Sequence, residues 1–158
     1  MSKITLPLDG HLAVPFQELL NDPLLVLKKF PNVDTLVAHG PLDYFLTTVP
    51  FALTNTLKLR RRWHIKLEVQ EDKLVWLPSD EHADDGCDGW ISGEITDGGN
   101  GRSRVTLSAV MEHRLLNGVT SVLYRNAIRQ ASYNFMLGFE TNFRTPGFQN
   151  DVPIWTGE

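Results

Sequence analysis

The stretch LKLRRRWHIKLEV, residues 57–69, alternates apolar and polar side chains along its whole length. Successive side chains of a β-strand point to opposite faces of the sheet, so a period of two predicts one long strand with a buried face and a solvated face. The buried face is expected to carry every second residue of the stretch: Leu57, Leu59, Arg61, Trp63, Ile65, Leu67 and Val69.

Arg61 is the single interruption of this apolar face. Its guanidinium cannot be deprotonated, and burying it without an anionic or hydrogen-bonding partner is costly. One interpretation is an apolar wall with one fixed positive charge, which suits an amphipathic acid. The alternative is that Arg61 lies at a bulge or twist, or extends past a sheet edge into water.

Composition limits the class of protein. The chain has 158 residues, of which 42% are hydrophobic, which predicts a single domain over residues 1–158. The net charge is −4 and Arg60–Arg62 is the one basic run, so a nucleic-acid partner is not expected. The chain has neither the roughly eighteen consecutive apolar residues of a membrane span nor the apolar core of a signal peptide. Its one cysteine, Cys87, fits a reducing compartment. We therefore expect a cytoplasmic protein without integral membrane association.

Other segments predict further strands and two short helices. Pro15 suits the first turn of a helix that stops at Asn21-Asp22-Pro23, and Pro23 suits the start of a second helix. Pro50 indicates that the β-rich segment 42–55 bends, ends or lies at an edge. The other expected strands are 4–8, 33–39, 74–77, 90–96 and 104–115, with turns at 70–73 and 97–101.

Residues 119–143 contain no proline and predict one long amphipathic helix. Together these elements predict an α+β fold, in which a curved antiparallel sheet of about six to seven strands grips this C-terminal helix and two short helices follow the first strand. The apolar side of the long helix is expected to carry Val119, Leu123, Tyr124, Ile128, Ala131, Phe135 and Phe139, and the polar side Arg125, Asn126, Arg129, Gln130 and Asn134.

The segment VPFQELLNDP, residues 14–23, is similar to the opening motif of the START-related helix-grip superfamily, which includes pollen-allergen-like proteins, START lipid-transfer domains and polyketide cyclases. The order of elements over nearly the whole chain resembles the same superfamily. This resemblance implies a strongly curved antiparallel sheet around the C-terminal helix, with a cavity between them that in many members binds an apolar or amphipathic small molecule. Members include carriers, cyclases and interaction modules, so the fold does not fix the function.

The candidate ligand-binding residues follow from this arrangement. Aromatic and aliphatic side chains could form the walls of a cavity with a few polar groups, although the same residues serve ordinary core packing equally well. Arg61 and His113 could point inward and hold a carboxylate or move a proton; the alternative for His113 is an exposed or core-satisfied histidine. The predicted set is Arg61, Trp63, Trp76, His113, Tyr124, Ile128 and Phe135.

We therefore predict binding of a small hydrophobic or amphipathic molecule, with or without an acidic group. The alternatives are a cyclase- or hydratase-type enzyme on the same fold and a protein-interaction module whose cavity is filled by its own side chains. The acidic loop 80–88 is expected to be solvated, because its spacing is not that of a calcium-binding loop. No metal or cofactor is predicted.

Overall fold

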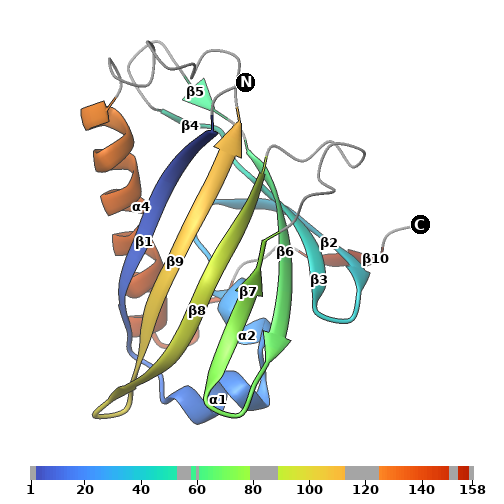
Figure 1. Cartoon of the computed structure of the whole chain (residues 1–158), viewed down its shortest axis with the longest axis vertical. Helices are drawn as coiled ribbons and strands as arrows, with labels where there is room; N and C mark the ends of the chain where they lie inside the picture. Colours follow the sequence, from blue (N-terminus) through green and yellow to red (C-terminus); the bar gives the residue numbers. More distant parts are fainter. Residues whose placement is uncertain are drawn as a thin grey trace.

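The structure is a computed structural model that describes residues 3–52, 58–59, 61–78, 89–112, 125–149 and 153–156. It is an α+β fold, in which a curved, mostly antiparallel sheet of eight strands is accompanied by one long C-terminal helix (Figure 1). Two short helices follow the first strand. The predicted fold class is therefore confirmed.

The main sheet has the strand order β1-β9-β8-β7-β6-β3-β2-β10, and β6 also pairs with β8 beyond the end of β7. All neighbours are antiparallel except the pairs β6–β8 and β2–β10. The strands are β1 (Lys3–Leu12), β2 (Val33–Gly40), β3 (Asp43–Thr48), β6 (Arg62–Val69), β7 (Lys73–Leu77), β8 (Gly89–Gly99), β9 (Arg102–Glu112) and β10 (Ile154–Thr156).

Two further strands form a separate small sheet, and three helices are described. The small sheet pairs β4 (Phe51–Ala52) with β5 (Lys58–Leu59). The helices are α1 (Phe16–Asn21), α2 (Leu24–Lys28) and α4 (Arg125–Arg144). The predicted start of the long helix, residues 119–124, lies outside the described residues. None of the described helices is long and apolar enough to cross a membrane.

The prediction of one continuous strand over residues 57–69 is wrong. The stretch contributes β5 to the small sheet and β6 to the main sheet, and Arg61 between them is in neither strand. The reason lies in the neighbouring strand: β3 ends at Thr48, just before Pro50, which has no N–H to continue a ladder. Within β6 the alternation holds for Trp63, Ile65 and Leu67, which are all buried.

The strand boundaries differ from the prediction at other places as well. β1 and β8 continue beyond the predicted strands to Leu12 and Gly99, and β10 was not foreseen at all. Val69, expected on the buried face, is 42% exposed because it borders the hairpin turn to β7. Apolar alternation therefore does not predict burial at strand ends, where no other layer of the structure covers the face of the sheet.

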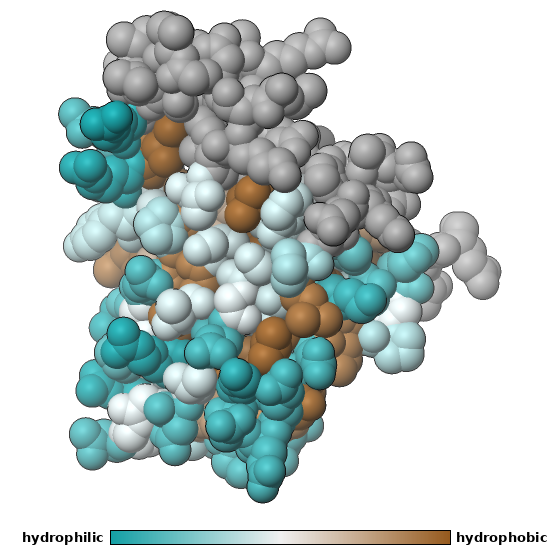
Figure 2. Space-filling view, in the orientation of Figure 1, coloured by the Kyte–Doolittle hydropathy of each residue, from teal (hydrophilic) through white to brown (hydrophobic). Residues whose placement is uncertain are grey.

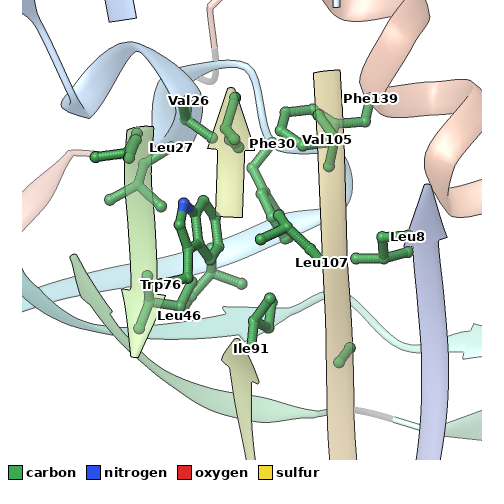
Figure 3. Packing of buried hydrophobic residues seen from close by; sticks show 14 of the residues in the cluster. Leu8, Val26, Leu27, Phe30, Leu46, Trp76, Ile91, Val105, Leu107 and Phe139 are labelled. Atoms are coloured by element: carbon green, nitrogen blue, oxygen red, sulfur yellow. The ribbon is translucent and has the colours of Figure 1, made fainter. Parts of the chain in front are cut away.

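The core consists of the inward-facing side chains of the sheet and the apolar sides of the helices. Figure 3 shows Trp76 of β7 and Phe30 close together, with Phe139 of α4 near Phe30. On the face seen in Figure 2, hydrophilic residues cover much of the lower part and hydrophobic residues form small separate patches. The apolar surface is thus concentrated on the inner side of the sheet, where α4 can cover it.

Helix α4 runs along β1, the strand at one edge of the sheet (Figure 1). The Ser132 hydroxyl donates a hydrogen bond to the backbone oxygen of Pro7, and the backbone N–H of His11 donates to a carboxylate oxygen of Glu140 at 3.4 Å. Gly10 lies between these two points, and a Cβ there would come within 2.8 Å of the Met136 methyl carbon. The helix thus provides hydrogen-bond partners for part of the backbone of an edge strand, which would otherwise be open to pairing with another strand.

Gly93 lies in the middle of β8, opposite Trp76 of β7 and Leu107 of β9. Its φ of 135° is in a region that side-chain-bearing residues rarely adopt, and a Cβ on it would lie 2.1 Å from the backbone oxygen of Thr106. A distorted backbone conformation in a central strand bends the strand locally. The position therefore requires glycine.

We predict that Gly93→Ala lowers the free energy of unfolding by about 3 kcal/mol or more, because it adds both backbone strain and a clash with the neighbouring strand. Urea denaturation followed by circular dichroism measures the loss. The control is Gly40→Ala, where a Cβ would have its nearest neighbour 3.9 Å away. Equal stability of the two variants would contradict this account of β8.

Candidate functional site: a cavity between the sheet and the long helix

A cavity of about 250 Å³ lies between the inner face of the sheet and α4. The strands β1, β9 and β6 contribute residues on the sheet side of the cavity, and α4 contributes residues on the helix side. The described residues that line it are Leu6, Leu8, Asn32, Trp63, Ala109, Ala131, Asn134 and Phe135.

Most of this lining is apolar, and the sequence alternation explains why. Leu6 and Leu8 of β1 are successive inward positions, and Ala109 of β9 is paired with Leu6 across the sheet. All three are buried. Ala131 lies on the side of α4 that faces the sheet and packs against the core. The two alanines keep the space open, because a larger apolar residue at either position would extend into it.

Two aromatic residues form the largest wall. Trp63 of β6 and Phe135 of α4 meet edge to face, with ring centroids 6.2 Å apart and an interplanar angle of 82°. Aromatic pairs favour this geometry, and it leaves both rings with surface toward the cavity. Phe135 also contacts Phe30 at 5.1 Å, so the wall is supported from behind.

Six of the seven predicted site residues separate into three groups. Trp63 and Phe135 line the cavity, as expected. Trp76 and Ile128 lie in the hydrophobic core and are not among the described lining residues. His113 and Tyr124 fall outside the described residues, so their predicted roles stay predictions.

Arg61 is buried, with 5% of its surface exposed, yet it is not one of the described residues that line the cavity. Its backbone is held by β3: the Thr48 N–H donates to the Arg61 oxygen at 2.9 Å, and the Arg61 N–H donates to the Thr48 hydroxyl oxygen at 3.2 Å. Arg61 thus sits at the junction of β5 and β6, where the strand is interrupted. A role for it in holding an acidic ligand remains a prediction.

The sequence reasoning missed six lining residues. Leu6, Leu8 and Ala109 were recognisable as inward positions of their strands, but nothing in the alternation distinguishes a cavity wall from packed core. Asn134 is predicted on the polar side of the helix, and Asn32 falls directly before the predicted strand 33–39. Their shared place at the cavity depends on how α4 lies across the sheet, which no local pattern encodes.

Other polar groups lie away from the cavity lining. His64 Nε2 is 2.5 Å from Asp43 Oδ1, and Arg62 lies over the Phe45 ring at 5.1 Å. Burial raises the pKa of Tyr44, and a hydrogen bond with the Leu42 backbone lowers it by a smaller amount. Among the described residues no group of three or more histidine, cysteine, aspartate or glutamate side chains could hold a metal ion. The acidic loop 80–88 falls outside the described residues.

No family model matches the chain, and no curated protein matches it. Solved structures do: TTHA0849 from Thermus thermophilus is similar with a TM-score of 0.53 at 12% identity, over 89% of this chain and 97% of that one. DR_A0006 from Deinococcus radiodurans is 17% identical over 85% of this chain and 99% of that one, with a TM-score of 0.36. The first likeness shows a shared sheet-rich fold, and the second adds nothing to it.

We predict that Phe30→Ala lowers the free energy of unfolding by about 3–5 kcal/mol, the usual range for a fully buried phenylalanine. Phe30 has no exposed surface and contacts rings from both the sheet and α4. Chemical denaturation provides the measurement. Tyr133→Ala, which removes an aromatic ring that is 64% exposed on α4, is the control and should change stability little. A similar loss in both variants would show that Phe30 has no special place in the core.

Proposed function

We propose that this protein binds a small hydrophobic or amphipathic molecule in the cavity between the sheet and α4. The observation that supports the proposal is the cavity itself, about 250 Å³ of space with walls that are mostly apolar and aromatic. Small-molecule sites typically combine such walls with a few placed polar groups. A module whose cavity is filled by its own side chains would not keep this volume.

The proposal includes membership of the START-related helix-grip superfamily and a cytoplasmic location. Membership is supported by the opening motif at residues 14–23 together with the element order, in which two short helices follow β1 and the long helix follows β9. A cyclase- or hydratase-type reaction would need inward polar groups. The residues predicted to supply them are Arg61 and His113: Arg61 is not among the described lining residues, and His113 lies outside the described residues. We place binding first because the described walls are mostly apolar and aromatic.

The volume limits the size of the ligand. A cavity of about 150 Å³ in another protein accepts benzene. On that scale the present cavity accepts a molecule of about ten non-hydrogen atoms, such as one ring with a short side chain. A long-chain fatty acid is too large to be enclosed. Trans-cinnamyl alcohol has a suitable size and places its ring against Trp63 and Phe135.

The cavity can be filled by mutation. We predict that Ala131→Leu weakens the binding of trans-cinnamyl alcohol by about tenfold or more, because the added side chain takes the space of the ligand while leaving the fold intact. Isothermal titration calorimetry measures the affinity, and thermal unfolding checks that stability is equal or raised. Asn126→Leu, which adds a leucine on the exposed side of the same helix, is the matched control.

Two outcomes would contradict the proposal. One is wild-type protein that is folded but neither binds the probe nor is stabilised by it. The other is Ala131→Leu protein that binds as tightly as the wild type, since the ligand would then occupy another place. Native mass spectrometry of the purified protein adds a direct measure, because a bound natural ligand gives a discrete increase in mass.

A further inference from the structure

Among the described residues that line the cavity, the polar side chains are two neutral amides, Asn32 and Asn134. Asn32 and Asn134 are exposed, whereas Leu6, Leu8 and Trp63 are buried. The amides therefore stand at the solvent-facing mouth, and the apolar walls lie deeper. A ligand that enters with its apolar part first leaves its polar end between these two side chains.

The Asn32 side of the mouth is held in place by the backbone. Asn32 has a φ of 61°, a left-handed conformation that asparagine adopts more readily than most residues. Its backbone oxygen accepts a hydrogen bond from the Val49 N–H at 2.8 Å. The same link between α2 and β2 is tied to α4, because the Asn142 amide nitrogen donates to the backbone oxygen of Lys29 at 2.8 Å. The two sides of the mouth are thus fixed relative to each other.

Asn134 is oriented by a neighbour on its own helix. The Gln130 amide nitrogen donates to the Asn134 side-chain oxygen at 3.0 Å. This bond engages the acceptor end of the Asn134 amide and directs the nitrogen, which carries two donors, away from Gln130. Asn134 therefore presents hydrogen-bond donors at the mouth to an acceptor on the ligand.

These neutral donors favour an uncharged ligand. No titratable side chain occurs among the described residues that line the cavity. With no cation among these described lining residues, a carboxylate would lose part of its hydration without compensation, whereas a neutral carbonyl or hydroxyl group loses less and can still accept a hydrogen bond.

We propose that the ligand is a small uncharged amphipathic molecule whose polar end, an amide, ketone or alcohol, is held by Asn32 and Asn134. This inference rests on the proposed function and names the class of ligand.

The experiment compares two probes of nearly equal size that differ in charge, trans-cinnamamide and trans-cinnamate, by isothermal titration calorimetry at neutral pH. Wild-type protein should bind the amide about fivefold more tightly or better, which is the scale of one net hydrogen bond. Two variants test the assignment. Asn134→Leu removes one amide from the helix, and Asn32→Gly removes the other while still allowing the positive φ. Each should weaken the binding of trans-cinnamamide by about fivefold and leave that of trans-β-methylstyrene, a third probe without a polar end, nearly unchanged.

The outcomes separate this inference from the proposed function. If neither probe binds, the binding proposal itself fails. If both bind equally, or if neither variant weakens the binding of trans-cinnamamide, the cavity is a binding site but the amides do not hold the polar end of the ligand. Tighter binding of trans-cinnamate that is lost in Arg61→Met would overturn the inference in favour of an acidic ligand. Only weaker binding of trans-cinnamamide in Asn134→Leu and Asn32→Gly, with the binding of trans-β-methylstyrene retained, supports it.

Discussion

The packing of Phe30 is the contact on which the arrangement of the helices and the sheet depends. Its ring lies 6.2 Å from Trp76 of β7, 5.1 Å from Phe135 and 5.3 Å from Phe139 of α4, measured between centroids. The end of the α1–α2 segment, the sheet and the long helix thus meet at one buried side chain. Because Phe135 also faces Trp63 across the cavity wall, this junction sets the separation of α4 from the sheet at the site.

The cavity is a consequence of how α4 is held at its two sides. Along β1 the helix is fixed by the hydrogen bond from Ser132 and by the close approach to Gly10. On the other side it is fixed by Asn142 and by Gly138, where a Cβ would come within 3.3 Å of Pro31. Between these lines of contact the lining residues Ala109 and Ala131 do not reach across the space. Tight packing at the margins and small residues in the middle leave a cavity that opens to solvent at Asn32 and Asn134.

Periodicity in the sequence predicted the fold class well, because strands such as β9 keep the same alternation through their whole length. The same signal could not predict the interruption at Arg61, since that depends on β3 ending before Pro50 in another part of the chain. The site was predicted less completely. Trp63 and Phe135 are large and sit on clear apolar faces, but Asn32 and Asn134 come from segments 102 positions apart whose meeting is decided by helix packing.

The two alanines at the cavity bear on the balance between stability and binding. Ala109 and Ala131 line a space of about 250 Å³ that opens to solvent beside the exposed Asn32 and Asn134. Larger apolar side chains at these two positions would bury more apolar surface, and filling a cavity commonly adds about 0.5–2 kcal/mol of stability. Alanine at both positions leaves that stabilisation unused, and a molecule that binds the folded state alone would stabilise it through mass action.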